Sequence, residues 1–313
     1  MINLGNYVIK EAVRCHFESD YVVNIYFGNQ KWTIRDINLE LIPVLKSGSV
    51  VEKKCSTNAF KFLFDNNLII RKYKSEPSNF LENNIFYFEN ALSSDKLPTS
   101  VQKEISNLNL LLIGLGGIGS VIGYGLKLLG VNNFVLIDYD TVQNNNLNRQ
   151  LLYNNNDIGK HKTTALKKRL ENIGFFPKIS CIEKKVTTIV DVESILCDNN
   201  IDFVVCAADS PHNISNIVST ACHNFAIPMQ FGGVGIFTGS WSSVLTKILK
   251  ATLRPQEISV STPTKGSISS TNLLISSFIL NEFLNYFTFS EDYECNVIYN
   301  IDFLKYKIKK ERL

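Results

Sequence analysis

Four closely spaced glycines in the middle of the chain have the pattern of a phosphate-binding turn. An apolar run, Leu108–Ile113, is followed by Gly114, Gly116, Gly117 and Gly119, which open a stretch with helical spacing. A glycine turn between a strand and a helix lets main-chain N–H groups and the helix dipole face a phosphate. Because tight packing of a strand against a helix needs the same glycines, the turn alone does not separate the two roles.

A carboxylate ends the next predicted strand, Phe134–Asp138. Asp138 lies at a distance from the glycine turn that suits hydrogen bonds from ribose hydroxyls, and Asp140 is placed to share that task. A carboxylate at this position favours a ribose without a 2′-phosphate. Capping of a turn or a helix is the alternative for either residue.

Two cations follow, Arg149 and Lys162. A hydride-transfer site needs a nicotinamide pocket rather than extra cations beyond the ribose, so these residues favour a polyphosphate over a dinucleotide. A guanidinium binds phosphate oxygens at two points, and a lysine adds a mobile charge as negative charge builds on a leaving pyrophosphate. For each residue alone, a surface charge is the alternative.

A further carboxylate, Asp209, follows the predicted strand Asp202–Ala207. It is expected at the carboxyl edge of the sheet, where open α/β folds bind ligands. One carboxylate together with phosphate oxygens is a usual way to hold Mg²⁺. The alternative is an N-cap for a helix that starts at Pro211.

Composition excludes several classes of protein. The 313 residues are 45% hydrophobic and carry a formal net charge of +3, too small to indicate nucleic acid or an anionic membrane as the main partner. The seven cysteines are scattered without a Cys-x-x-Cys pair, and the first residues lack a signal-peptide pattern, so we expect a reduced, cytoplasmic protein. The stretch 108–137 is apolar, but its glycines, Lys127 and Asn132-Asn133 favour a buried strand, helix and strand over a membrane span.

From residue 105 to 313, strand and helix signals alternate, which predicts an α/β fold with a Rossmann-like, doubly wound sheet. We place strands near Leu108–Ile113, Phe134–Asp138, Lys178–Val186, Asp202–Ala207 and Ile227–Phe231, and helices near Gly117–Leu129, Lys160–Ile173 and Pro211–Phe225. A β-rich run, Ser240–Ile248, and an apolar helix, Asn272–Phe287, complete this domain.

Residues 1–75 are predicted to form a small α+β module. A hairpin is expected in Tyr7–Asp36, turning at Gly28-Asn29, followed by a helix that ends at Gly48, a short helix near Val50–Cys55 and a third helix after Ser56. Residues 76–104 are polar with scattered aromatic side chains, which predicts a connecting arm.

Taken together, the motifs of the second domain resemble the ThiF/MoeB/HesA family of adenylyltransferases, relatives of ubiquitin-activating enzymes. The matching segments are Gly114–Gly119, Asp138–Asp140, Asn146–Gln150, Gly159–Lys162 and Ala208-Asp209, over about residues 105–290. The resemblance implies that Asp138 and Asp140 hold the ribose of ATP. It implies that Asn146, Arg149 and Lys162 hold the phosphates, that Gln150 and the glycines complete the nucleotide site, and that Asp209 holds Mg²⁺.

Two departures from this family narrow the expected chemistry. Sulfur-carrier activators commonly have two Cys-x-x-Cys pairs for structural zinc and a reactive cysteine after the sheet; here no cysteine lies between Cys222 and Cys295. We therefore expect no structural zinc and no thioester or persulfide transfer. Family members usually dimerise, and an arm Arg-Gln pair reaches the partner's ATP. Residues 83–88 lack it, so either Arg71 or Lys72 replaces that arginine or the contact is missing.

Residues 1–75 resemble the winged-helix peptide clamp, or RiPP recognition element, of enzymes that modify ribosomally made peptides. In such clamps a leader peptide adds as a strand to a sheet edge. We expect Val22–Phe27 and Thr57–Leu68 to line that groove. A clamp joined to a zinc-free adenylating domain most resembles the adenylating enzymes of microcin C-type antibiotic biosynthesis.

The predicted function is ATP- and Mg²⁺-dependent adenylation of the C-terminal carboxylate of a short precursor peptide by a homodimer, giving an acyl-adenylate and, on further reaction, a peptidyl-nucleotide. One alternative is ATP-driven cyclisation or dehydration of the peptide. Another is a leader-binding delivery subunit with little activity of its own. A nicotinamide oxidoreductase remains as the least specific alternative, because the glycine turn is shared across such folds.

Overall fold

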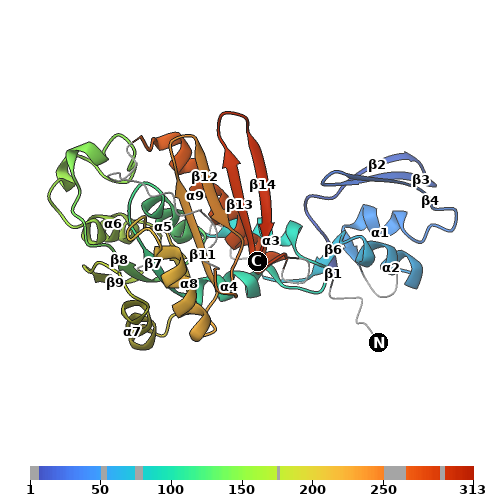
Figure 1. Cartoon of the computed structure of the whole chain (residues 1–313). Helices are drawn as coiled ribbons and strands as arrows, with labels where there is room; N and C mark the ends of the chain where they lie inside the picture. The colour runs from blue at the N-terminus through green and yellow to red at the C-terminus, as the bar shows by residue number, and fades with distance from the viewer. Residues whose placement is uncertain (1–6, 51–54, 75–79, 175–176, 250–265, 290–292) are drawn as a thin grey trace. The chain divides into compact units, whose positions relative to one another are not determined.

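The computed structural model describes residues 7–50, 55–74, 80–174, 177–249, 266–289 and 293–313. The chain divides into two compact units, residues 1–103 and 104–313 (Figure 1). Within the described residues, no helix has the length and hydropathy of a membrane span.

Up to residue 71, the described part of the first unit forms two three-stranded antiparallel sheets and two short helices. One sheet has the order β5-β1-β6 and the other β2-β3-β4. The elements are β1 (Tyr7–Ile9), β2 (Arg14–Ser19), β3 (Val22–Phe27), β4 (Gln30–Arg35), α1 (Ile42–Ser47), β5 (Ser49–Val50), α2 (Thr57–Asp65) and β6 (Ile69–Arg71). The predicted small N-terminal α+β module is therefore confirmed.

Local sequence signals explain where these elements begin and end. Gly28 has φ of 55° in the two-residue turn between β3 and β4, and Gly48 has φ of 67° at the end of α1. The Ser56 hydroxyl accepts a hydrogen bond from the Ala59 N–H and caps α2. The short helix expected near Val50–Cys55 falls largely on residues 51–54, outside the described residues, and Val50 belongs to β5.

The segment interpreted as a connecting arm contains two helices that the sequence patterns did not predict, α3 (Glu82–Ala91) and α4 (Pro98–Asn107). Buried polar contacts attach α3 to the N-terminal strands. The Lys10 ammonium, 1% exposed, donates to the Leu92 carbonyl at 2.6 Å. The Glu89 carboxylate accepts from the Glu11 N–H at 2.9 Å and from the Tyr73 hydroxyl. A helix fixed in this way is part of the first unit rather than a linker.

The second unit is built on an eight-stranded sheet of order β14-β13-β12-β11-β10-β7-β8-β9. The strands are β7 (Asn109–Ile113), β8 (Asn133–Ile137), β9 (Lys178–Ile182), β10 (Phe203–Cys206), β11 (Met229–Val234), β12 (Thr238–Ser242), β13 (Val297–Asp302) and β14 (Lys307–Arg312). The five strands from β11 to β9 are parallel, and β12, β13 and β14 extend the sheet with antiparallel pairing. The strand order reverses between β7 and β10, which places a topological switch point at their carboxyl ends.

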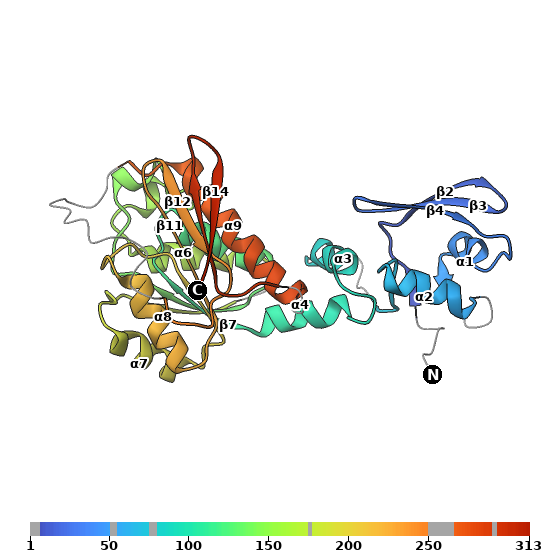
Figure 2. The same cartoon turned by 45° about the vertical axis from the view of Figure 1, so that its right-hand side comes forward.

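Helices cover both faces of this sheet. They are α5 (Gly119–Leu128), α6 (Lys162–Glu171), α7 (Ile189–Asn199), α8 (Ile214–Asn224) and α9 (Ser269–Thr288). Helix α9 packs on β11, β12 and α5, while α7 and α8 pack together on the opposite face (Figure 2). That opposite layer contributes fully buried side chains such as Val192 and Val218 to the core. The predicted Rossmann-like, doubly wound architecture is confirmed. Helix α7 and the β13–β14 hairpin were not predicted.

The buried Lys10 leads to a prediction about pH. Burial lowers the pKa of the Lys10 ammonium to about 8, from its ordinary value of 10.5. Between these values the unfolded chain binds one more proton than the folded chain, so stability of the first unit rises with pH, by up to about 1.4 kcal/mol per pH unit. We expect Lys10→Met to remove this rise.

The measurement is urea unfolding in a Trp241→Phe background, in which Trp32 of the first unit is the remaining tryptophan. At each pH, the free energy of unfolding of the variant is subtracted from that of the parent. The difference removes contributions that both proteins share, such as that of Tyr73, whose pKa is raised in the folded protein. Identical profiles for parent and variant would contradict the assignment.

Candidate functional site

A cavity of about 740 Å³ lies in the second unit, at the carboxyl ends of the parallel strands. Ten of the eleven residues predicted from the sequence line it. They are Gly114, Gly116, Gly117, Asp138, Asp140, Asn146, Arg149, Gln150, Lys162 and Asp209. Gly119 does not line the cavity. A Cβ at Gly119 would lie 1.8 Å from the Gly114 carbonyl oxygen, so this glycine serves the packing of α5 on the turn.

The other glycines of the turn divide by what surrounds them. Gly114 has φ of 85°, and its added Cβ would lie 2.5 Å from the Ala208 nitrogen; an added Cβ at Gly117 would meet Asn272 Nδ2 at 2.2 Å. Both positions exclude a side chain for steric reasons internal to the protein. At Gly116 the nearest atom to an added Cβ is Gln150 Nε2, 3.8 Å away. Gly116 therefore exposes bare backbone to the cavity.

Asp138 fixes the glycine turn to the end of β8. Its Oδ2 accepts from the Leu115 N–H at 2.7 Å and its Oδ1 accepts from the Asp140 N–H at 2.8 Å. Burial raises the pKa of the Asp138 carboxyl, and Lys162 and the two N–H groups oppose that rise. The carboxylate keeps acceptor capacity for a ribose hydroxyl, because each oxygen has a second lone pair.

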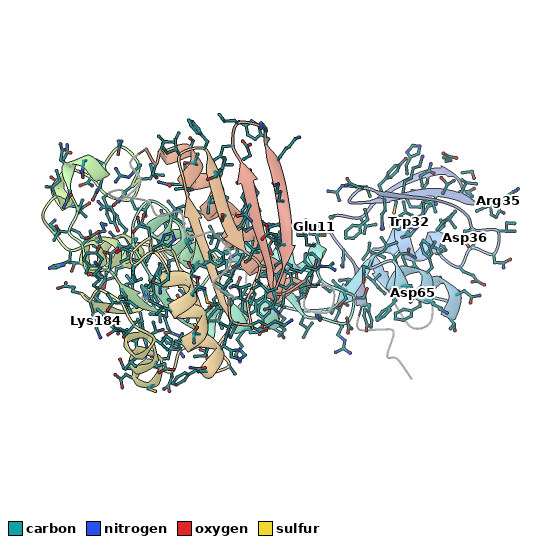
Figure 3. All side chains as sticks on the ribbon, in the orientation of Figure 1. Glu11, Trp32, Arg35, Asp36, Asp65 and Lys184 are labelled. Atoms are coloured by element: carbon teal, nitrogen blue, oxygen red, sulfur yellow. The ribbon has the colours of Figure 1, made fainter. Side chains whose placement is uncertain are left out.

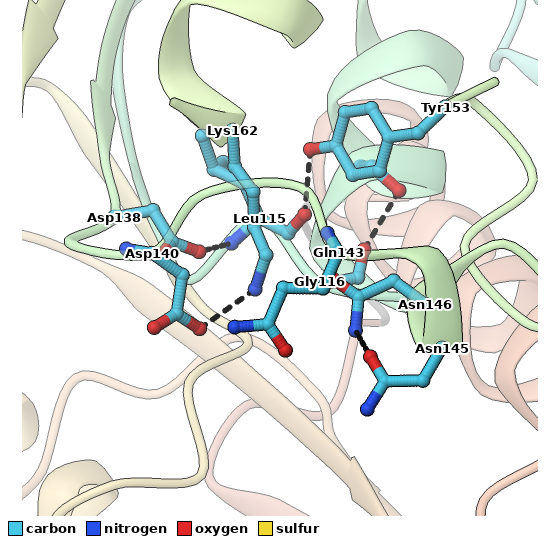
Figure 4. A network of polar contacts seen from close by, with 10 residues as sticks. Leu115, Gly116, Asp138, Asp140, Gln143, Asn145, Asn146, Tyr153 and Lys162 are labelled. Carbon is cyan, nitrogen blue, oxygen red and sulfur yellow. Dashed lines mark hydrogen bonds and ion pairs between the residues drawn. The ribbon is translucent and has the colours of Figure 1, made fainter. Parts of the chain in front are cut away.

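Lys162 and Asp140 form an ion pair inside the cavity, with 2.8 Å between Lys162 Nζ and Asp140 Oδ2 (Figure 4). The lysine side chain is 7% exposed, whereas that of Asp140 is 43% exposed. The Lys162 N–H also donates to the Asp140 carbonyl at 3.0 Å, which fixes the first turn of α6 beside the end of β8. The ammonium is thus held at the cavity with donors to spare, since it has three N–H groups.

The segment after β8 is organised by its own amides. Asn146 Oδ1 accepts from the Gln143 N–H at 3.1 Å, and Asn146 Nδ2 donates to Asn145 Oδ1 at 3.1 Å (Figure 4). Arg149 Nη1 donates to the Asn145 carbonyl at 2.5 Å and to Asn148 Oδ1 at 3.1 Å. Asn146 is therefore a structural support in this state. The half-buried guanidinium retains further N–H groups for an anion.

Asp209 stands beyond the end of β10 with an exposed side chain, and it makes no hydrogen bond or ion pair with the described residues. Helix α8 begins at Ile214 and its N-cap is Asn213, so the helix-cap alternative for Asp209 is wrong. The described residues contain no group of three metal-ligating side chains. Beside the phosphates of a bound nucleotide, a lone carboxylate would fit Mg²⁺, which takes one or two carboxylates and completes its shell with phosphate oxygens and waters.

Several cavity residues were missed by sequence reasoning. They are Tyr139, Lys184, Ser210, Gly233, Ser267 and Asn272, together with other lining positions. Lys184 forms an ion pair with Asp191 at 2.7 Å, and the Lys185 ammonium lies 5.1 Å from the centre of the Tyr139 ring. Lys184 follows β9 as Asp138 follows β8, so its position at a strand end was the available signal. Asn272 comes from α9, and no local pattern connects it with the glycine turn.

Comparison with known proteins gives a family match that includes the whole second unit. A model of the ThiF family matches residues 88–313. The chain belongs to the ThiF family. Curated ThiF-type relatives include the adenylyltransferase and sulfurtransferase MOCS3 of Dictyostelium discoideum, 30% identical over 152 residues, and the molybdopterin-synthase adenylyltransferase of Haemophilus influenzae, 30% identical over 131 residues. These matches cover 48% and 42% of this chain, and the chain spans 34% and 52% of the relatives.

Solved structures show a likeness along nearly the whole chain. A structure of E. coli MccB with MccA-N7isoASN superposes with a TM-score of 0.78 at 20% identity, and covers 98% of this chain and 96% of its own. The MccB structure with ATP superposes with a TM-score of 0.76 over the same shares. PaaA superposes with a TM-score of 0.72 at 15% identity. The likeness establishes that both units share the fold of these proteins.

The contrast between Gly116 and Gly117 gives a prediction. An added methyl group at Gly117 would collide with the Asn272 side chain and with the Arg149 carbonyl. Gly117→Ala should therefore lower the melting temperature by several degrees, which corresponds to about 1–3 kcal/mol of overpacking. Gly116→Ala has room in the protein, so its melting temperature should stay within about 2 °C of the parent while nucleotide affinity falls.

The measurements are differential scanning calorimetry and titration with α,β-methylene-ATP. Equal thermal destabilisation by the two substitutions would show that Gly116 is also needed for packing.

Proposed function

We propose that this protein uses ATP to adenylate the C-terminal carboxylate of a ribosomally made precursor peptide, as in microcin C-type biosynthesis. The observation that carries the proposal is one cavity that collects a bare glycine backbone, two carboxylates after β8, three cations and a free carboxylate, in a chain that also has a separate β-rich module. The likeness to MccB structures described with MccA or ATP supports a peptide acceptor and this nucleotide.

In this reaction a carboxylate oxygen attacks the α-phosphorus of ATP, the bond from that phosphorus to the bridging oxygen of the β-phosphate breaks, and pyrophosphate leaves. No proton has to move, so the residues act by position and charge. Lys162, held by Asp140, and Arg149 face the charge that builds on the leaving group. Bound at Asp209, Mg²⁺ would supply further positive charge to the phosphates.

The first unit offers a sheet edge for the peptide, although not the strand expected from the sequence. Strand β3 (Val22–Phe27) pairs with β2 on one side and with β4 on the other, so it has no free edge. Val22–Phe27 and Thr57–Leu68 are expected to line the groove of the leader, but because β3 is not an edge strand, we propose that the leader adds at β4. Strand β2 carries a register irregularity between Phe17 and Ser19, which interrupts its outer edge, whereas β4 is regular over six residues.

The geometry of β4 suits strand addition. The Asp36 N–H donates to the Tyr21 carbonyl, which sets the hydrogen-bonding pattern between β4 and β3. The main-chain groups of the even-numbered β4 residues therefore point toward β3, and the N–H and C=O groups of Lys31, Thr33 and Arg35 point outward. Trp32 lies on the side of the sheet that faces the helices of this unit (Figure 3). Its ring packs edge-on against that of Phe62 of α2, with 6.2 Å between the ring centroids. An extended peptide that adds as a strand needs free main-chain N–H and C=O groups at a sheet edge and nearby side chains to pack on, and β4 offers both.

Activation of a sulfur carrier is the second candidate, because the curated relatives carry names of that kind. That chemistry ends on sulfur, and the reactive cysteine expected after the sheet from the resemblance to sulfur-carrier activators is absent, since no cysteine lies between Cys222 and Cys295. The cyclisation alternative differs from nucleotidylation in the mass of the product, since AMP is retained in one case and water is lost in the other. A delivery subunit would bind leader peptide without turning over ATP.

The homodimer also stays a proposal. One of the two residues considered as the replacement for the arm arginine, Arg71, lies beside Tyr7 of its own unit, whose hydroxyl raises the pKa of the guanidinium. Arg71 and Lys72 both stay candidates for a contact across a dimer, and a missing contact is the third possibility.

Exchange of labelled pyrophosphate into ATP, driven by a precursor peptide with a free carboxylate, tests the activity. Lys162→Met should lower the exchange rate by about 100-fold or more, because it removes a positive group that faces developing charge. Lys160→Met is the matched control: this side chain lies outside the cavity, is 48% exposed, and should leave exchange unchanged. A pyrophosphate exchange rate that stays unchanged in both Lys162→Met and Asp209→Ala would contradict the proposal.

Peptide binding is tested at β4. Thr33→Pro removes an outward N–H on an edge strand, where proline is tolerated, and should weaken leader binding by about tenfold. Thr33→Val keeps the N–H but loses the Thr33 hydroxyl bond to Asn24, so it should bind like the parent. Fluorescence anisotropy with labelled peptide gives both affinities, and equal weakening by the two variants would count against strand addition.

A further inference from the structure

We propose that Tyr153 is a positioning residue for the phosphates of the nucleotide: its hydroxyl holds the Leu115 carbonyl and thereby directs the Gly116 N–H into the cavity. This role rests on the proposed use of ATP. It concerns the phosphate half of the same site and assigns a function to a residue that does not itself line the cavity.

A buried hydrogen bond joins Tyr153 to the glycine turn. The Tyr153 hydroxyl donates to the Leu115 carbonyl at 2.7 Å (Figure 4). Tyr153 is 5% exposed and Leu115 is fully buried. Burial raises the pKa of the Tyr153 hydroxyl well above its ordinary value, and the carboxylates of Asp138 and Asp157 add to the rise. The phenol therefore stays protonated and acts as the donor.

The direction of the Gly116 N–H follows from this bond. The peptide between Leu115 and Gly116 is trans, so its C=O and its N–H point in opposite directions. The C=O points to Tyr153, and neither Leu115 nor Tyr153 lines the cavity, whereas Gly116 does. The N–H of the same peptide is therefore directed toward the cavity.

The main-chain groups on either side of this N–H are already used. The Leu115 N–H donates to Asp138 Oδ2 at 2.7 Å. The Gly116 carbonyl accepts from the Ser120 N–H at 3.1 Å and from the Ser120 hydroxyl at 2.7 Å, at the start of α5. Among the described residues, the Gly116 N–H has no acceptor of its own. The turn is thus held at three points, and the group that these bonds leave over is a donor that suits a phosphate oxygen.

Helix α6 fixes Tyr153 as well as Lys162. Arg169, about two turns after Lys162, donates through Nε to the Leu152 carbonyl at 3.0 Å. Its Nη2 lies 2.6 Å from Asp157 Oδ2, and the side chain of Asp157 is 5% exposed. These bonds hold the chain on both sides of Tyr153. One helix therefore sets both the cation at the cavity and the hydroxyl that orients the N–H.

A fixed N–H suits phosphate binding because the donor does not have to reorient when the anion arrives. Without the Tyr153 hydroxyl, the peptide between Leu115 and Gly116 would be free to rotate, and the buried Leu115 carbonyl would lose its partner. The N–H would then no longer be held toward the cavity. The loss should fall on ligands that carry phosphates.

Tyr153→Phe removes the hydroxyl and keeps the ring, and two ligands that differ only in their phosphates report its effect in the full-length protein. Isothermal titration should show binding of α,β-methylene-ATP weakened by about tenfold. Adenosine, followed by saturation-transfer NMR, should keep the affinity it has for the parent.

Tyr293→Phe is the matched control. The Tyr293 hydroxyl donates to Glu282 at 2.7 Å and accepts from the Val244 N–H at 2.9 Å, and Tyr293 does not line the cavity. This variant loses comparable hydrogen bonds in the same unit, and it should bind both ligands like the parent.

A double variant tests whether the hydroxyl acts through the Gly116 N–H. If it does, the effects of Gly116→Ala and Tyr153→Phe on α,β-methylene-ATP affinity will not add, and the double variant should bind about as weakly as the weaker of the two single variants. Losses that multiply would contradict an action through Gly116.

Equal losses of adenosine and α,β-methylene-ATP in Tyr153→Phe, or unchanged affinity for both, would overturn the assignment. A parent that binds α,β-methylene-ATP no better than adenosine would do the same. If no peptide drives pyrophosphate exchange in the parent while Tyr153→Phe still loses affinity only for the phosphorylated ligand, the role of Tyr153 stands and adenylation of a peptide fails.

Discussion

The site depends on one buried carboxylate that joins two segments of chain. Asp138 accepts the N–H of Leu115, in the glycine turn, and the N–H of Asp140, two residues beyond itself. Without those N–H groups and the nearby Lys162, the desolvated carboxylate would be unstable, and its raised pKa shows that burial still dominates. The same bonds set the path of the turn, so Gly116 faces the cavity and Asp140 meets Lys162.

The residues of this site were predictable because their placement follows from topology. Parallel strands that alternate with helices bring their carboxyl ends to one edge, so Asp138, Asp209 and the glycine turn must converge there once the strands are recognised. Lys162 belongs to the same argument, since it opens the helix after β8. Asn272 and Gly233 lie on elements whose position depends on how the chain crosses the sheet, which local periodicity does not report.

The parts of the fold that were missed share a physical cause. The sequence of α3 is polar, so it gives no strong helix pattern. The helix is held to the N-terminal strands by hydrogen bonds of two buried charged side chains that are far apart in the sequence, Lys10 and Glu89. Strand β14 is exposed along its whole length, so it has no apolar alternation and exists through its pairing with β13. The position of the free edge in the β2-β3-β4 sheet also depends on how the strands pair. Strand β3 has the strongest strand pattern in the sequence, but it pairs on both sides and is central, so the free edges belong to β2 and β4.

Membership of the ThiF family does not by itself choose the acceptor. The family model begins at residue 88, so most of the first unit lies outside the part of the chain that the family model matches. Under the proposed function, selection among acceptors would come from the edge of β4 in the first unit together with the acceptor side of the cavity in the second. Main-chain pairing at β4 would bind many extended sequences with little discrimination. Reaction at the correct end of the chain would then depend on the cavity, because a bound peptide reacts only where its terminal carboxylate is held within reach of the α-phosphate.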